Sequence, residues 1–482
     1  MSNSKIIVLI VLLLTFQSCF EDNDDNGAYA SEINDFVWKG MNAFYLYKQE
    51  TLDLANDRFD SSTEYANYLN NYETPEILFE SLIYNRENID KFSVLTDNYI
   101  ELEQTLSGTS VSNGMEFGLS YKPNSSNEIF GVVRYIHPNS NAEANNIKRG
   151  DIFTSIDNKV LNISNYNSLL SQENYQVNFA TYNDMNTDTT NDDTIELNNI
   201  NVDLSKQPLN KNPIFHYDII NSSGRNIAYL MYNQFVPNFD NNLEIIFSEF
   251  KSTSVDELIL DLRYNPGGSI NSAVLLSSLI TGQFQNEIFS TEQWNTDIQN
   301  YWLNNDPEYL INRFLTSEDS LNLNRVYILT SRSSASASEL VINCLAPYID
   351  VVQVGTTTYG KYQASVTLYD SENFTSQNIN PSHTYAIQPL VLKTLNVIGQ
   401  TDYFNGLIPD FEFEERPYDM GTIGNINEPL LSQTINLIGS RNLFENRMEI
   451  YGLIDDSQIF ENFNKEMYIT KSKFKKCYEF KF

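Results

Sequence analysis

The 482-residue chain is poor in histidine and in basic residues, and each shortage excludes a class of function. Its three histidines, His137, His216 and His383, have no second ligand type at metal-binding spacing. We therefore expect neither a metal site nor a Ser/His/Asp triad. The 30 Lys and Arg residues against 63 Asp and Glu give a formal charge of -33, which would repel nucleic-acid phosphates. No cofactor and no nucleic-acid partner is expected.

Cysteine is equally scarce, with three residues at Cys19, Cys344 and Cys477. Such a small number excludes a disulfide framework, although one bridge between Cys344 and Cys477 stays open.

Long apolar runs are also missing, apart from a short one near the N-terminus. Lys5 precedes an apolar run over residues 6–14, which is too short to span a bilayer comfortably and is typical of a secretory signal. Residues 16–19 resemble a bacterial lipobox, which implies removal of residues 1–18 and a lipid on Cys19. An ordinary signal peptide with a coincidental cysteine is the alternative.

The residues after Cys19 favour the lipoprotein interpretation. Residues 19–31 form an acidic, polar tether that cannot pack, and it also resembles the signals of some Bacteroidetes surface lipoproteins. The expected localisation is the bacterial cell envelope, with export and membrane attachment through the N-terminal lipid.

The length predicts several domains. Aromatic and apolar residues at three- and four-residue spacing predict a helical N-terminal region over residues 32–105. Short β-type runs follow in residues 106–205, at 115–121, 131–136, 151–156 and 176–182, with short helices expected within 138–146 and at 166–170.

This order of elements resembles a circularly permuted PDZ-like domain. The run Gly114-Met115-Glu116-Phe117-Gly118 looks like a carboxylate-binding loop, and residues 147–152 resemble the turn into a central PDZ strand. The resemblance implies that Gly114, Met115, Phe117 and Gly118 bind a peptide that adds to the sheet edge as a strand. A small β module that only packs against its neighbour is the alternative.

From residue 206 to 410 the pattern alternates between strand and helix. Strands are predicted at 227–232, 257–262, 325–330 and 351–354, and helices at 243–251, 270–280 and 337–345. The fold class is therefore α/β, a mostly parallel sheet covered by helices, in which sites gather at the strand ends. Residues 283–319 interrupt the pattern as an insertion near the cleft, and residues 411–482 are expected to form a helical extension.

Three loops rich in glycine or serine follow successive strands. Residues 334–339 (SASASE) open a predicted helix, residues 261–268 (DLRYNPGG) carry paired glycines, and residues 355–361 (GTTTYGK) deliver a lone lysine. Because a helix N-terminus can stabilise an oxyanion, a serine there can serve chemistry, although for this segment alone helix capping is the more common explanation. Loops at the ends of consecutive strands should converge on one edge of the sheet.

Together these loops resemble the signature of the S41 family, the C-terminal processing (tail-specific) peptidases. The motifs stand in the family's order and spacing, and residues 405–410 (NGLIPD) resemble its end-of-domain motif. The resemblance implies a ClpP/crotonase-like core.

The resemblance also implies the roles of individual residues. Ser336 would be the nucleophile and Lys361 the general base. An ordinary lysine, with a pKa of ~10.4, is protonated at neutral pH, so an apolar, cation-flanked pocket is expected to lower the pKa of Lys361. The backbone N–H groups of Gly267 and Ala337 would form the oxyanion hole.

Further positions near this dyad carry smaller roles. Glu339 is expected to orient polar groups, or to stabilise the helix dipole, and Gly268 would let substrate approach the backbone. The family often has Gly and Gln where this chain has Tyr362 and Ser365. Ser365 is expected to replace the amide by a hydrogen bond to the lysine.

The sequence thus predicts a serine endopeptidase acting on protein or peptide substrates. One alternative is a catalytically impaired peptide-binding lipoprotein on the same fold, and another is a hydrolase or acyltransferase of other esters.

Overall fold

The computed structural model describes residues 31–187, 189–439, 452–460 and 465–469. The predicted signal peptide, the lipidated Cys19, nearly all of the tether and Cys477 lie outside the described residues. No helix in the described ranges is long and apolar enough to cross a membrane.

The N-terminal region is helical, as its periodicity indicated. It contains α2 (Glu32–Phe44), η1 (Lys48–Glu50), η2 (Leu52–Leu54), α3 (Ser62–Asn70), α4 (Pro75–Ser81), β1 (Val94–Thr96) and α5 (Tyr99–Leu106). One face of α2 buries Phe36, Val37, Met41 and Phe44 in the main core. This apolar stripe fixes the helical region to the rest of the molecule.

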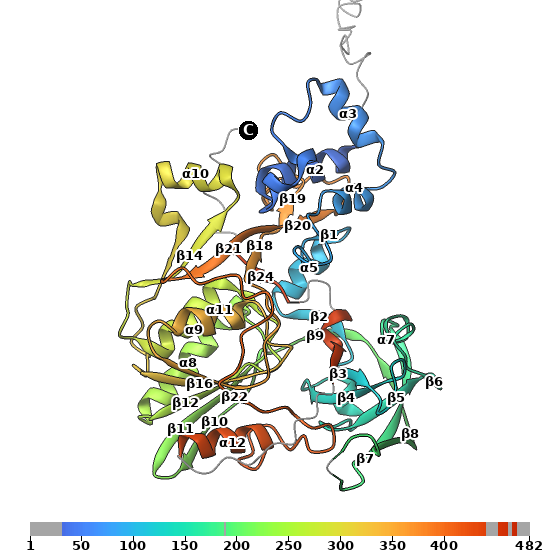
Figure 1. Ribbon diagram of the computed structural model, residues 1–482, viewed down its shortest axis with the longest axis vertical. Coiled ribbons are helices and arrows are strands. Elements are labelled where there is room, and N and C mark those ends of the chain that lie inside the picture. The colour runs from blue at the N-terminus through green and yellow to red at the C-terminus, as the bar shows by residue number, and fades with distance from the viewer. Residues whose placement is uncertain (1–30, 188, 440–451, 461–464, 470–482) are drawn as a thin grey trace, which may run out of the picture.

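The β-rich module, residues 106–205, lies beside the α/β domain (Figure 1). Its elements are β2 (Thr109–Ser112), β3 (Met115–Tyr121), β4 (Ile129–Ile136), α6 (Asn141–Ala144), β5 (Ile152–Ile156), β6 (Lys159–Val160), α7 (Tyr166–Leu170), β7 (Asn174–Asn183) and β8 (Thr194–Ser205). The sheet order is β23-β3-β4-β5-β7-β8, so a strand from the C-terminal part of the chain, β23 (Leu453–Asp456), forms its edge.

The α/β domain is built on a six-stranded sheet. Its order is β10 (Ile214–Ser222), β11 (Arg225–Tyr232), β12 (Glu257–Asp261), β16 (Arg325–Thr330), β17 (Asp350–Gly355) and β22 (Phe411–Glu412). Only the β10–β11 pair is antiparallel. β9 (Gln207–Asn210) links this domain to the module by pairing with β2.

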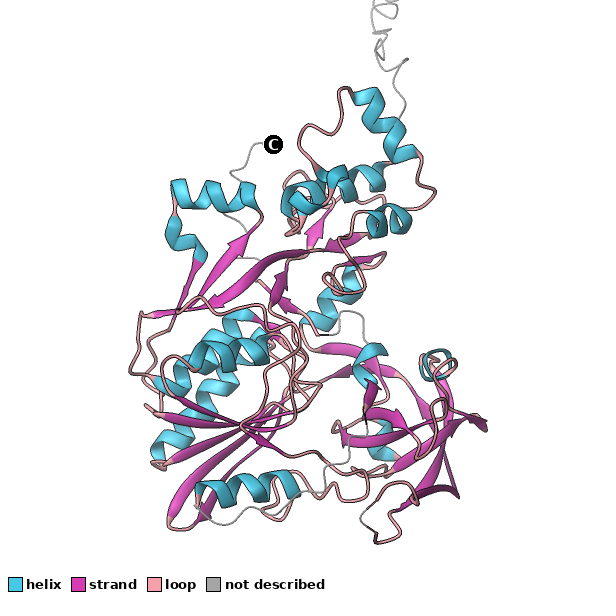
Figure 2. Cartoon of the chain, viewed as in Figure 1, coloured by secondary structure: helices cyan, strands magenta, loops and turns pink. Residues whose placement is uncertain are grey.

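Helices cover both faces of this sheet (Figures 1 and 2). Leu258 and Leu260 of β12 face the core shared with α8 (Asp240–Ser252), α9 (Ile270–Thr281) and α11 (Ala337–Leu345), whereas Ile259 faces α12 (Pro429–Ile438). The 3-10 turn η3 (Pro237–Phe239) precedes α8 and buries no residue. Because both faces are buried, the central strands are apolar without alternation.

A second six-stranded sheet stands at the carboxyl ends of these strands. Its order is β13 (Gly268–Ser269), β24 (Met467–Tyr468), β18 (Gln363–Ser365), β21 (Leu390–Asn396), β14 (Ile288–Trp294) and β15 (Ile311–Arg313). Residues 283–319, predicted as an insertion, supply β14, α10 (Thr296–Asn305), η4 (Pro307–Leu310) and β15. A small sheet of β1, β20 (Ala386–Gln388) and β19 (Leu368–Tyr369) joins it to the N-terminal helices.

The prediction of a helical extension over residues 411–482 is wrong for most of its described part. One α-helix, α12, is present there with a 3-10 turn, η5 (Ser457–Phe460), and three short strands, β22, β23 and β24. These strands are too short to show a period in the sequence. Each forms because it pairs with strands that lie far away along the chain: β22 with β17, β23 with β3, and β24 with both β13 and β18.

A buried ionic network fastens the C-terminal half to the end of β12. Arg263 is fully buried and contacts Asp261 at 2.7 Å, Glu428 at 2.7 Å and Glu415 at 2.8 Å. Tyr229 donates a hydrogen bond to Asp261 at 2.7 Å. The network therefore ties the loop after β12 to the segment that leads into α12.

Replacing Arg263 with Ala should destabilise the protein strongly, because the buried Asp261 would lose its cation and only Arg149 would remain as a cation beside Glu415 and Glu428. The expected loss is about 3–5 kcal/mol of unfolding free energy, measured by urea denaturation. The exposed pair of Arg325 and Asp350 supplies the control, and Arg325→Ala should cost less than about 1 kcal/mol. Equal losses in the two variants would contradict this role of the network.

Candidate active site

Ser336 occupies a strained position at the N-terminus of α11. Its backbone φ is 64°, in the left-handed region, and the residue is fully buried. A non-glycine residue held there costs about 1–3 kcal/mol, which the surroundings must supply. The loop is held by Ser334, which donates to the Leu262 carbonyl at 2.7 Å, and by Ala335, whose N–H donates to the Asn265 carbonyl at 3.1 Å.

Ser336 and Glu339 form a capping box at the start of α11, but this box does not give the Ser336 hydroxyl a well-formed hydrogen bond. Its Oγ is buried and has no hydrogen-bond partner among the described residues. An unpaired buried hydroxyl lowers the stability of the fold, and a catalytic role is one reason why a protein retains such a group.

Glu339 connects the serine loop to the lysine loop. Its buried carboxylate accepts the N–H of Ser336 at 2.8 Å, of Gly360 at 2.6 Å and of Lys361 at 2.8 Å, and the hydroxyl of Thr358 at 2.5 Å. Burial raises the pKa of Glu339 to about 7, while these four hydrogen bonds oppose the rise. The predicted orienting role agrees with this geometry, because one oxygen, Oε2, accepts from both Ser336 and Lys361.

Lys361 is fully buried, and burial lowers the pKa of its amine. The expectation of a cation-flanked pocket is wrong. Nζ lies 3.0 Å from Glu466 Oε2 and 4.5 Å from the centre of the Phe92 ring, and the carboxylates of Glu466, Asp90 and Glu339 all raise the pKa against the effect of burial. In the described state the lysine has a carboxylate partner.

The paired glycines lie directly against the serine. Gly267 has φ 114°, and a Cβ on it would lie 2.4 Å from Ser336 Cβ and 3.0 Å from the Ala337 nitrogen. Gly268 has φ 134°, and a Cβ there would be 2.2 Å from the Phe235 carbonyl oxygen. The N–H of Gly267 donates to Asn265 Oδ1 at 2.9 Å in this state. The three loops thus converge, as their places after the strands indicated.

Ser365 lies in the site, but it does not replace the family amide in the expected way. Its hydroxyl donates to Glu466 Oε2 at 2.6 Å, so it reaches Lys361 through that carboxylate. Gln363 points elsewhere and donates to the Tyr47 hydroxyl at 3.0 Å. Tyr362 is buried and packs against Tyr403.

The loop at residues 114–118 of the β-rich module is not open to solvent. Met115 and Phe117 are core residues, and a Cβ on Gly114 would lie 2.1 Å from Ser140 Cβ. The N–H of Phe117 donates to Ser457 Oγ at 3.1 Å, and Gly118 is paired with Asp456 of β23. The predicted peptide-binding edge is therefore covered by the chain itself.

Two carboxylates near the lysine, Glu466 and Asp90, were not predicted as site residues. Asp90 is fully buried and accepts hydrogen bonds from Tyr45 at 2.7 Å and from the Ser93 hydroxyl at 2.6 Å. Neither carboxylate stands in a motif, and both lie more than a hundred residues from Lys361. No local pattern could have revealed them.

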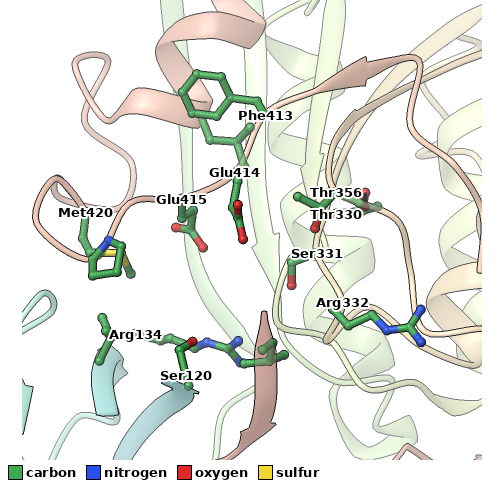
Figure 3. A pocket seen from close by; sticks show the side chains of 15 residues that line it. Ser120, Arg134, Thr330, Ser331, Arg332, Thr356, Phe413, Glu414, Glu415 and Met420 are labelled. Carbon is green, nitrogen blue, oxygen red and sulfur yellow. Dashed lines mark hydrogen bonds between the residues drawn. The ribbon is translucent and has the colours of Figure 1, made fainter. Parts of the chain in front are cut away.

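A separate cavity of about 100 Å³ lies between the module and the α/β domain (Figure 3). Arg134 of the module and Glu414 line it, and Figure 3 shows Ser331 and Arg332 of the serine loop at its side. Burial and the neighbouring Glu412 and Glu415 raise the pKa of Glu414 to about 8. Ser336 and Lys361 do not line this cavity.

In the described part of the chain, no group of three His, Cys, Asp or Glu side chains could hold a metal ion. Cys344 is buried and forms no disulfide within the described residues, and the open question of a bridge to Cys477 lies outside them.

Two family models match the chain. Peptidase family S41 matches residues 226–388, which include Ser336 and Lys361, and the Peptidase S41 N-terminal domain matches residues 32–94.

Curated relatives match over shorter stretches. A tail-specific protease of Haemophilus influenzae is 25% identical over 195 residues, covering 40% of this chain and 25% of that protein. The carboxy-terminal processing protease CtpB of Bacillus subtilis is 26% identical over 193 residues, covering 38% of this chain and 36% of that protein. The matches therefore span between a quarter and about a third of the relatives' lengths.

The fold is also similar to a crystal structure from Bacteroides fragilis that is assigned to the S41 proteases. The TM-score is 0.63 at 22% identity, and the match covers 84% of this chain and 97% of that one. The mixed α/β fold predicted from the sequence is thus that of an S41 protease.

Replacing Gly267 with Ala should displace Ser336, because the new Cβ cannot lie 2.4 Å from another carbon. We expect the rate of Ser336 labelling by a fluorophosphonate probe to fall at least about 10-fold, as for a loss of 1.4 kcal/mol. Gly224→Ala is the control, since Gly224 also has a positive φ, 77°, but no atom within 4 Å of its Cβ position. Equal labelling of both variants would contradict the packing argument.

Proposed function

The chain contains a peptidase S41 domain and an S41 N-terminal domain, and from this premise we propose that it is a serine endopeptidase with a Ser336/Lys361 dyad. The observation that carries the proposal is the Glu339 carboxylate, which accepts hydrogen bonds from the backbone of both residues. An arrangement that holds together two loops, one with an unpaired buried hydroxyl and the other with a buried amine, suits nucleophilic catalysis.

In the proposed reaction, neutral Lys361 accepts the Ser336 proton as Oγ attacks the carbonyl carbon of the scissile bond. The N–H groups of Gly267 and Ala337 stabilise the resulting oxyanion, which requires the Gly267 N–H to leave Asn265. The protonated lysine then returns its proton to the leaving amine. In the second half of the reaction, Lys361 accepts a proton from water as the water oxygen attacks the acyl-enzyme. The lysine then returns this proton to Ser336 Oγ as the ester bond breaks.

Two features of the Lys361 environment have opposite effects on its role as general base. Complete burial favours the neutral amine, which the mechanism needs, whereas the carboxylate of Glu466 favours the charged form. In the described state Lys361 is therefore paired with Glu466, and turnover requires the two side chains to separate.

The substrates proposed are extended protein segments, and the β-rich module is proposed to bind them as a PDZ-like domain. The support is that the edge of β3 accepts an added strand, which in this structure is β23. Export to the cell envelope and attachment through lipidated Cys19 are part of the same proposal, and their support is the N-terminal sequence.

The ion pair of Lys361 with Glu466 favours one second candidate, a peptide-binding lipoprotein without turnover. A lysine held permanently in its charged form cannot accept a proton. A hydrolase of other esters would differ from both by cleaving ester substrates but no peptides.

Replacing Ser336 with Ala should abolish hydrolysis of a fluorescein-labelled unfolded protein, with a loss of at least about 10³-fold in kcat. Ser252→Ala is the matched control, because the Ser252 hydroxyl only contacts the Glu249 carbonyl at the end of α8. If Ser336→Ala kept the wild-type rate, or if the wild type showed no hydrolysis, the endopeptidase proposal would fail.

The rate should rise with pH, because the active form requires a neutral Lys361. Burial places the pKa of Lys361 below its usual value, so the rise in kcat/KM should have its midpoint below pH ~10.4. Lys361→Arg should be inactive at every pH from 6 to 10, since a guanidinium keeps its proton there. Lys159→Arg, at an exposed position, serves as control, and a flat wild-type profile would exclude lysine as the base.

A further inference from the structure

The strand β24 lies in the middle of the second sheet, between two elements of the candidate active site. It runs parallel to β13, where Gly268 pairs with Met467 and Ser269 with Tyr468, and parallel to β18, where Ser365 pairs with Tyr468. Met467 is fully buried. A strand of the C-terminal part of the chain thus fills the space between the glycine loop and the strand that follows Lys361.

Glu466, which precedes β24, contacts the chemical groups of the site directly. Its carboxylate lies 3.0 Å from Lys361 Nζ and accepts the Ser365 hydroxyl at 2.6 Å. Its backbone carbonyl would lie 3.0 Å from a Cβ on Gly267, the residue next to Ser336. The backbone at Glu466 therefore lies close to the loop that contacts Ser336, and the Glu466 side chain pairs with Lys361.

The strand β23 covers the second proposed peptide site in the same manner. It pairs antiparallel with β3, with Leu453 opposite Ser120 and Asp456 opposite Gly118. Its Asp455 accepts a hydrogen bond from Tyr166 of α7 at 3.1 Å. The backbone N–H of the predicted carboxylate-binding loop is used by Ser457, as a bound peptide would use it.

Asp456 joins the two sites. Its carboxylate accepts the Ser333 hydroxyl at 2.7 Å and lies 3.4 Å from Arg134 of the module. Ser333 belongs to the loop that carries Ser336, and Asp456 is 1% exposed. One buried side chain of the C-terminal part thus contacts both the module and the nucleophile loop.

We propose that β23 and β24 are a built-in substrate-like ligand, which occupies the strand-accepting edges of the module and of the active site and keeps the enzyme closed. The inference rests on the proposed peptidase function and adds its regulation. Substrate in the form of an extended polypeptide would replace these strands at the edges of β3, β13 and β18. Departure of β24 also removes Glu466 from Lys361, so opening the site and freeing the base are one event.

Replacing Glu466 with Gln in the full chain tests the closure at the base. The amide keeps the shape but not the charge, so kcat/KM on the unfolded protein substrate should rise at least about 5-fold at pH 7. The pH midpoint should fall, because only Asp90 and Glu339 would remain as anions facing Lys361, beside the Phe92 ring. Glu308→Gln, which alters an exposed pair with Arg313, is the control. A fall in kcat would make Glu466 a positioning residue and overturn the proposal.

A reversible cross-link tests the closure at the module without touching the dyad. Ser120→Cys and Leu453→Cys lie at paired positions of adjacent antiparallel strands, where a disulfide fits, in a chain also carrying Cys19→Ser and Cys477→Ser. The oxidised form should hydrolyse at least about 10-fold more slowly than the reduced form, and reductant should restore the rate. Ser120→Cys alone should not respond to reductant.

These experiments separate the two proposals when Ser336→Ala is assayed beside them. If Ser336→Ala is inactive while the oxidised and reduced cross-linked forms are equally fast, the closure is wrong and the peptidase assignment stands. If Ser336→Ala retains the wild-type rate, the peptidase assignment itself fails.

Discussion

The candidate active site depends on one buried carboxylate. Glu339 sits in the first turn of α11 and accepts four hydrogen bonds, from the serine loop on one side and from the lysine loop on the other. Without it, three backbone N–H groups would be buried without partners, at a cost of about 1–3 kcal/mol each. The two loops leave different strands of a parallel sheet, and this carboxylate fixes the distance between them.

Around this carboxylate, glycines allow the backbone segments of the site to lie closer together than side chains would permit. Gly267 and Gly268 combine positive φ angles with contacts that no side chain would permit, and Gly360 has φ 102° next to the Phe404 carbonyl. The glycines therefore permit this backbone conformation, while hydrogen bonds from the side chains of Asn265 and Ser334 to backbone groups hold the loops in place. The strain at Ser336 is sustained because each neighbouring loop is anchored independently.

Much of the α/β domain could be predicted because its signals are local. The buried strand β12 and the helix α11 have bounds close to those predicted, and the three site loops follow strands, where the topology requires a common edge. The same reasoning could not find Glu466, Asp90 or β24. Their roles come from pairing between segments far apart in sequence, and a two-residue strand has no period that a sequence pattern can show.

The environment of Lys361 was predicted with the correct direction but the wrong neighbours. Lys361 is fully buried, and burial lowers the pKa of its amine as expected. The flanking charges depend on tertiary contacts, and they are carboxylates instead of cations. The prediction of a helical extension failed for a related reason, since β24 pairs with β13 and β18 inside a sheet and its Met467 is buried in the main core.

The contact of Asp456 with both Ser333 and Arg134 has a thermodynamic consequence. Coupling between two binding sites is reciprocal, so any free energy that this carboxylate transmits from the module to the serine loop is also transmitted from the loop to the module. Under the proposed function, a compound that binds at Ser336 and shifts its loop would change the affinity of the module for peptides by the same factor as peptides change the affinity for that compound. The Asp456 contacts would in this way link the binding free energies at the two sites, in addition to holding the two domains together.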